Sequence, residues 1–172
     1  MELIMWRGCI IKESSLEVTG TLNCELSIFY WLNSHYNDLI KDSSFASLVG
    51  GNTLQFDPTL DERFDLVCYD DKINMIFDKD KRLKFFIVGC PLDDKLVSIL
   101  STEDIPLTEK MDLASIKSVL GEPVKSVGSR KLPGLVKNGW IQYDLLGQYK
   151  LTFSLAHTNP DQIVDIRISV CE

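Results

Sequence analysis

Two stretches of alternating apolar and polar residues limit most strongly what this chain can fold into. The first is KINMIF (72–77) followed by RLKFFIVG (82–89), and the second is KLTFSL (150–155) followed by QIVDIRISV (162–170). Alternation with a period of two predicts strands that bury one face, and the short polar segment inside each stretch predicts an antiparallel hairpin. Each hairpin therefore needs other elements to cover its apolar face.

Other segments supply further strands and the covering helices. Alternation predicts strands at 64–69 and 140–144, and the apolar, β-rich composition of 1–12 predicts a first strand. Apolar residues at helical spacing predict helices over 21–40 and 112–120, and Gly121 and Pro123 are typical residues just beyond a helix end. The run 96–100 fits either a strand or a helical turn, and 124–139 is predicted to be a loop.

These elements place the chain in the α+β class, with antiparallel β-meanders covered by helices. Both parts of the chain are read as a helix followed by three strands, and KINMIF aligns with KLTFSL. The sequence therefore predicts a single domain over 1–172, with two α-β-β-β pseudo-repeats, 1–105 and 106–172, in one continuous sheet. One alternative stays open, namely that the two hairpins look alike only because period-two alternation constrains little else.

The charge of the chain limits its partners. The 172 residues carry a net charge of −7, and the window 57–104 holds twelve acidic and seven basic residues. Such a surface disfavours nucleic acids and anionic membranes and attracts basic partners. No apolar run is long enough for a membrane helix, and residues 1–15 lack the order of a signal peptide, so a cytoplasmic protein is expected.

Motifs that carry catalysis or hold cofactors are not found in the sequence. It has no GxSxG, no P-loop, no GxGxxG and no HExxH, and His35 and His157 lie 122 positions apart. The five cysteines form no CxxC pair and are expected to be reduced, mostly buried thiols. We therefore expect a protein that is not an enzyme and that holds neither a cofactor nor a metal. The basic residues of 125–137 allow a phosphate site but lack the aromatic residues of a nucleic-acid surface.

Pairs of aspartates mark the predicted turns of the first hairpin and the segment after it. Solvated turns explain such pairs, and a metal site is a minor alternative, because the spacing of a calcium loop is missing. The functional hypothesis is a carboxylate surface for a basic protein partner, since charge complementarity raises association rates. Its candidate residues are Asp70, Asp71, Asp78, Asp80, Asp93 and Asp94.

The segment from residue 64 to the C-terminus resembles bacterial immunity proteins of the pyocin, colicin and contact-dependent inhibition type. The resemblance rests on FDLVCYDDKINMIFDKDKRLKFFIV, LGEPVKS, GWIQYDL, YKLTFSL and QIVDIRI, and covers about 60% of the chain. It implies binding to, and neutralisation of, a cognate toxin domain, with a basic nuclease as the expected partner. Two alternatives stay open, a small enzyme of unrecognised type and a structural or adaptor subunit of a larger assembly. The oligomeric state is not predicted.

Overall fold

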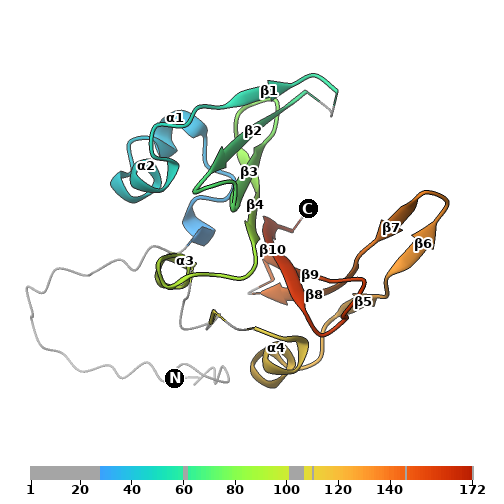
Figure 1. The fold of residues 1–172 in the computed structure, drawn as a ribbon. Coiled ribbons are helices and arrows are strands. Elements are labelled where there is room, and N and C mark those ends of the chain that lie inside the picture. Colours follow the sequence, from blue (N-terminus) through green and yellow to red (C-terminus); the bar gives the residue numbers. More distant parts are fainter. Residues whose placement is uncertain (1–27, 60–61, 101–106, 110, 146, 172) are drawn as a thin grey trace, which may run out of the picture.

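The computed structural model of the chain describes residues 28–59, 62–100, 107–109, 111–145 and 147–171. Eight strands form one antiparallel sheet in the order β1-β2-β3-β4-β10-β9-β8-β5, and β6 and β7 form a separate two-stranded hairpin (Figure 1). This confirms the α+β class with antiparallel meanders. The strands are β1 Gln55–Asp57, β2 Arg63–Cys68, β3 Ile73–Phe77, β4 Leu83–Gly89, β5 Lys125–Val127, β6 Arg130–Leu132, β7 Leu135–Lys137, β8 Gly139–Leu145, β9 Tyr149–Leu155 and β10 Ile163–Val170.

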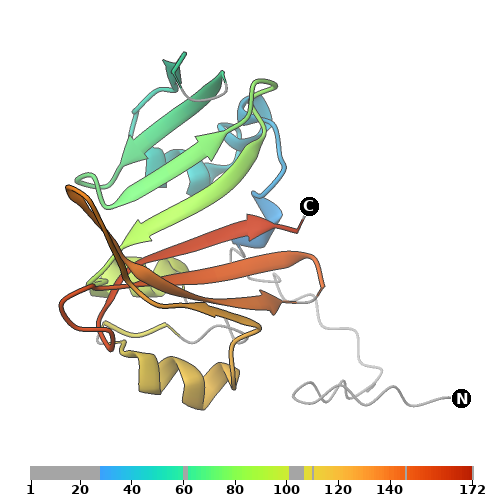
Figure 2. The same cartoon turned by 90° about the vertical axis from the view of Figure 1, so that its right-hand side faces the viewer.

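The helices cover one face of the sheet, and the core lies between the two layers (Figure 2). Trp31 packs edge-on against Phe45 at 5.2 Å and reaches Phe86 of β4 at 6.2 Å between ring centroids. At the other end, the hydroxyl of Tyr143 in β8 donates to the carbonyl of Gly121 just after α4. The helices are the 3₁₀ turn η1 Ile28–Tyr30, α1 Tyr36–Leu39, α2 Ser43–Val49, α3 Asp94–Leu100 and α4 Leu113–Leu120.

The ends of α4 agree with the sequence prediction. Asp112 is the N-cap, and its carboxylate accepts a hydrogen bond from the Ser115 N–H at 2.7 Å. This satisfies one of the N–H groups that a helix start leaves free. Hydrogen bonding from the side chain of Ser115, followed by its N–H, lowers the pKa of Asp112. Gly121 ends the helix with φ +79°, a backbone angle that favours glycine.

The predicted helix over 21–40 is wrong within its described part. Residues 28–40 contain η1, an irregular segment and the four-residue helix α1 instead. The irregular segment forms tertiary backbone bonds, because the Asn33 N–H donates to the Leu83 carbonyl at 2.7 Å and the Leu83 N–H donates to the Ser34 carbonyl. These bonds outweigh the helical spacing of the apolar residues. Residues 21–27, and the strand predicted at 1–12, lie outside the described part.

The structure also gives the secondary structure of residues 96–100 and 124–139. Residues 96–100 are helical, as part of α3. The predicted loop over 124–139 is wrong, because it holds β5 and the hairpin of β6 and β7. Three-residue strands leave too little alternation to be recognised.

The order of the strands is the same from both ends of the sheet. Strands β1 to β4 (the first half) run inward from one edge, strands β5, β8, β9 and β10 (the second half) run inward from the other, and β4 pairs antiparallel with β10 in the middle. The registers match as well: residues 73–77 correspond to 151–155, and 85–88 correspond to 165–168. Lys84 and Val164 are each skipped at equivalent register shifts. The halves thus repeat one arrangement, and descent from a duplication stays a prediction.

Candidate binding surface

The two faces of the sheet differ in what covers them. The helices lie on one face, which we call the helix-covered face, and the other faces the viewer in Figure 2 without a covering helix among the described elements. We call this other side the open face. Period-two alternation sends successive side chains of each strand to opposite faces. Strand β3 shows this clearly, because Ile73, Met75 and Phe77 are fully buried whereas Asn74 and Ile76 are half-buried.

On the helix-covered face, the register gives eight equivalent positions in the two halves besides Phe64 and Gly139, where a half-buried aromatic residue corresponds to glycine. Every one of the sixteen side chains is hydrophobic and at most 6% exposed. The core therefore imposes the same requirement on both halves. The equivalent pairs are Leu66 and Ile141, Cys68 and Tyr143, Ile73 and Leu151, Met75 and Phe153, Phe77 and Leu155, Leu83 and Ile163, Phe86 and Ile166, and Val88 and Ile168.

On the open face, the two halves differ. Four apolar residues of the first half correspond to polar or charged residues of the second, and we call these four the apolar patch. Cross-strand pairing of Ile76 with Phe85, and of both Val67 and Ile87 with Asn74, places them on neighbouring strands. Since the second half keeps the same strand arrangement with polar residues, the fold does not require the patch. The equivalent pairs are Val67 and Gln142, Ile76 and Ser154, Phe85 and Asp165, and Ile87 and Arg167.

At two positions on the outer strands, the second half has apolar residues where the first half has polar or charged ones. Trp140 and Val127, which stand opposite each other on β8 and β5, correspond to Asp65 and Gln55 of the first half. Trp140 and Val127 are half-buried. The second half thus has only a small apolar pair close to its edge, whereas the patch of the first half extends over β2, β3 and β4.

The apolar patch is bordered by charged groups. The guanidinium of Arg167 lies over the ring of Phe85, 5.8 Å from its centroid, and so covers part of one patch residue. On the other side, Arg63 and Asp65 form an ion pair at 3.2 Å. Val67, at 40% exposure, is the most open of the four. An apolar centre with a charged border is typical of protein-binding surfaces.

Among the six predicted aspartates, Asp78 is the closest to the patch in the chain, two residues after Ile76, followed by Asp70. Asp70 and Asp71 form the turn between β2 and β3, three and four residues after Val67, and both are exposed. Tyr69, Asp70 and Asp71 all have positive φ, between 51° and 61°. Residues with side chains adopt this region rarely, so the surrounding structure holds the turn in its shape.

Asp93 and Asp94 lie near the same turn at the start of α3. The Asp93 carboxylate accepts from the Leu96 N–H at 2.9 Å and from the Tyr69 hydroxyl at 3.3 Å, and it pairs with Lys72 at 3.5 Å. The helix N–H, followed by Lys72, lowers the pKa of Asp93. Burial and the neighbouring Asp93 raise the pKa of Tyr69. Asp93 therefore has a structural role in starting α3, while Asp94 is exposed.

Asp78 and Asp80 lie at the opposite end of β3, about 15 Å from the Asp70 turn at about 3.3 Å per strand residue. Asp78 accepts hydrogen bonds from the N–H groups of Asp80 and Arg82 and pairs with Lys84, so it shapes its own turn. The six aspartates thus form two groups, at the two ends of β3, and not one surface.

The described cysteines and carboxylates do not form a reactive cluster. Burial raises the pKa of Cys68 to about 11, and burial with the nearby Asp165 raises the pKa of Cys90 to about 11. Such thiols are poor nucleophiles near neutral pH. Within the described ranges, no group of three His, Cys, Asp or Glu side chains is placed to hold a metal ion.

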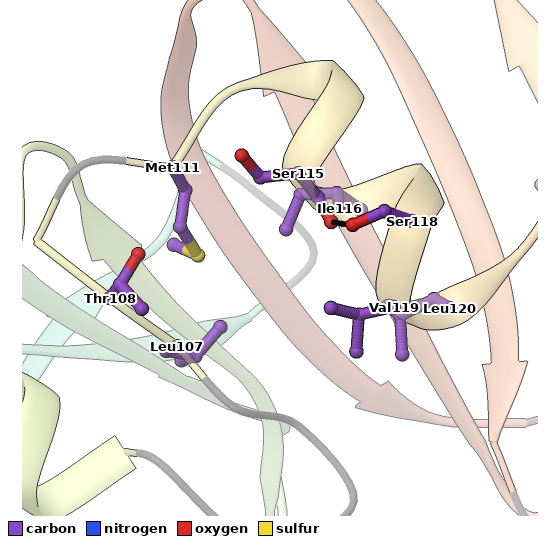
Figure 3. A pocket seen from close by; sticks show the side chains of 8 residues that line it. All are labelled: Leu107, Thr108, Met111, Ser115, Ile116, Ser118, Val119 and Leu120. Carbon is purple, nitrogen blue, oxygen red and sulfur yellow. Dashed lines mark hydrogen bonds between the residues drawn. The ribbon is translucent and has the colours of Figure 1, made fainter.

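A small cavity of about 180 Å³ lies between α4 and the segment around Leu107 (Figure 3). Its wall is mostly apolar, and Figure 3 shows Ile116 on α4 and Met111 on the segment that precedes the helix. The hydroxyl of Ser118 donates to the Ser115 carbonyl of its own helix, so it is not free to orient a ligand. We therefore regard the cavity as a packing gap beside α4.

The apolar patch was missed by sequence reasoning although a signal was present. Residues 85–88 read FFIV, four apolar residues in succession, whereas the equivalent 165–168 read DIRI and alternate strictly. A continuous apolar run in a strand indicates apolar side chains on both faces.

Comparisons with known proteins assign no family to this chain. No protein-family model and no curated protein sequence matches the chain. One solved structure, an extracellular protein containing a SCP domain from Bacillus anthracis str. Ames, is similar over 93% of this chain, with a TM-score of 0.48 and 8% identity. The chain spans half the length of that protein. Within the described residues, no helix has the length and apolar character needed to cross a membrane.

Proposed function

We propose that this protein is an immunity protein that binds a cognate bacterial toxin domain through the open face of its first half. One observation carries the proposal: the apolar patch is present in the first half and replaced by polar residues at equivalent positions of the second. Within one molecule, the second half serves as a control for what the fold needs. The excess apolar surface of the first half is then explained by a partner.

The chemistry of the patch supports a protein partner. Phe85, Ile76 and Ile87 are half-buried and Val67 is exposed, so a partner can remove further apolar surface from water. Each square ångström removed is worth about 25 cal/mol. Contiguous apolar surface on a water-facing sheet is costly for a monomer and is typical of interaction sites.

The charge next to the patch supports a basic partner. Asp70 and Asp71 are exposed at the end of β2, where Val67 belongs to the patch. A carboxylate pair beside an apolar centre speeds the approach of a basic protein and sets its orientation. Basic nucleases have the opposite charge to this surface, and the resemblance of residues 64–172 to immunity proteins suggests this class. Inhibition by occlusion asks for no reactive group on the inhibitor.

A growth assay tests the proposal. The proteins encoded next to the gene for this chain are produced one at a time in a bacterial host, with and without this chain. We expect one of them to stop growth when produced alone and to be harmless in the presence of this chain. The two should then co-purify as a complex. If none of the neighbouring products is toxic, or if a toxic one is not neutralised, the proposed function is wrong.

The acidic turn can be tested on the same pair of proteins. Changing Asp70 and Asp71 to lysine should slow association with a basic toxin at low salt by about tenfold, because electrostatic steering is lost. Changing Asp80 to lysine reverses one charge at the other end of β3, where Ile76 belongs to the patch, and serves as the comparison, with a smaller expected effect. Equal effects of both changes would show that the turn of Asp70 and Asp71 has no special role.

A further inference from the structure

The hairpin of β6 and β7 stands apart from the rest of the described chain. We call residues 130–137, which comprise β6, the turn at Pro133 and Gly134, and β7, the arm. Figure 1 shows the arm pointing away from the sheet and helices, and all six of its strand residues are exposed. An isolated two-stranded hairpin is marginally stable in water, so an arm of this kind gains most from a bound partner.

The base of the arm is held tightly. The Gly139 N–H donates to the Ser129 hydroxyl at 3.0 Å, and a Cβ at Gly139 would lie 2.9 Å from the Val127 carbonyl oxygen. Only glycine allows the two chain segments to approach so closely where the arm leaves the sheet. The arm is therefore presented by an anchored base.

The side chains of the arm combine positive charge with apolar surface. Leu132 and Leu135 stand opposite each other beside the turn at 45% and 54% exposure, and Val136 is 39% exposed. Arg130 and Lys137 are a directly opposed pair of like charge, which is unfavourable in an isolated hairpin. No acidic residue occurs between 123 and 143 to neutralise them. The arm thus fits a surface that is both acidic and apolar.

The chain itself has such a surface. Outside the arm it has 15 basic and 25 acidic residues, a net charge of −10. The turn of Asp70 and Asp71 next to the exposed Val67 offers carboxylates beside apolar surface. The arm of the same copy points away from the sheet in Figure 1, so one copy does not join the two surfaces. A basic toxin, in contrast, would be repelled by the arm.

We propose that the arm docks on the acidic first half of a second copy of this chain, so that two copies associate by reciprocal contacts. Each copy supplies one arm and one acceptor surface, which closes the assembly as a dimer. The contact is electrostatic at its border and apolar around Leu132 and Leu135. Because the acceptor includes the Asp70 turn, a toxin that binds there would compete with the arm.

Sedimentation velocity on the purified full chain tests this without any toxin, so the result is independent of the proposed function. At 50 mM NaCl we expect a concentration-dependent dimer, with a dissociation constant that rises at least tenfold at 500 mM NaCl. Changing Arg130 and Lys137 to glutamate should weaken the dimer at least tenfold. The matched control changes Lys41 and Lys79, which are exposed outside the arm, to glutamate and should leave the dimer intact.

A charge exchange provides the second readout. Changing Asp70 and Asp71 to lysine should also abolish the dimer. Mixing this variant with the Arg130→Glu/Lys137→Glu variant should restore association, because the two unchanged surfaces fit each other and the two charge-reversed surfaces are also complementary. The proposal fails if the unmodified chain stays monomeric at 200 µM and 50 mM NaCl. It also fails if the dimer is indifferent to the arm, or if the monomer binds duplex DNA or anionic lipid vesicles through the arm instead.

Discussion

The two halves of the sheet share an arrangement of strands and differ most in the residues of the open face. Eight equivalent pairs on the helix-covered face are hydrophobic in both halves, whereas four open-face positions are apolar in the first half and polar or charged in the second. A repeated unit separates two requirements that are normally mixed. What both halves keep is needed for folding, and what one half alone has is free to serve a function.

The second half lacks the apolar patch but has an extra element, the arm. Between β5 and β8 it carries the arm, whereas the first half passes from β1 to β2 through residues 58–62. The second half also ties its helix to the sheet through Tyr143, where the first half has Cys68. Each half has thus added its own feature at a place that the shared core does not control.

The largest effects are expected from the central pair of the shared core. Phe86 of β4 and Ile166 of β10 are equivalent and at most 1% exposed. Phe86→Ala should lower the free energy of unfolding by about 3–5 kcal/mol and Ile166→Ala by about 2–5 kcal/mol, since each leaves a cavity. Urea denaturation measures both. A loss under 1 kcal/mol in either half would show that the halves do not share one core.

A smaller loss of stability is expected from the side-chain hydrogen bond of Tyr143, at the position where the first half has Cys68. Tyr143→Phe removes the hydrogen bond to the Gly121 carbonyl and leaves the ring in the core, which should cost about 1 kcal/mol. Tyr149→Phe is the control, because the Tyr149 hydroxyl reaches the Phe29 carbonyl only at 3.4 Å. Thermal melting compares the two. Equal losses would mean that the contact with Gly121 has no special weight.

The smallest effect concerns pH and α4. The pKa of Asp112 is lowered by its bonds to Ser115, so its cap stabilises the fold above the ordinary pKa near 3.8 and loses this contribution as pH falls through the lowered value. Asp112→Asn keeps a capping oxygen without a titrating charge. The stability advantage of the unmodified chain over this variant should be present at pH 6 and shrink toward pH 3. An advantage that grows on acidification would contradict the role of the charge.

The long strands and α4 could be predicted because alternation and capping are local signals. The irregular segment at 31–35 could not, since its conformation depends on backbone bonds to Leu83, about fifty positions away. The six aspartates were predicted as turns, yet their division between the two ends of β3 follows from the strand pairing. The arm escaped prediction because its strands have three residues each and none of them is buried.

The binding role of the open face can be tested most directly by giving the first half the residues of the second. Val67→Gln with Ile76→Ser copies Gln142 and Ser154, and Gln142→Val with Ser154→Ile is the reverse control. The measurement is the dissociation constant of the toxin identified by the growth assay. We expect a 10- to 100-fold increase for the first variant, about 1.4–2.7 kcal/mol, and no change for the control. An unchanged affinity in a folded first variant would contradict the account.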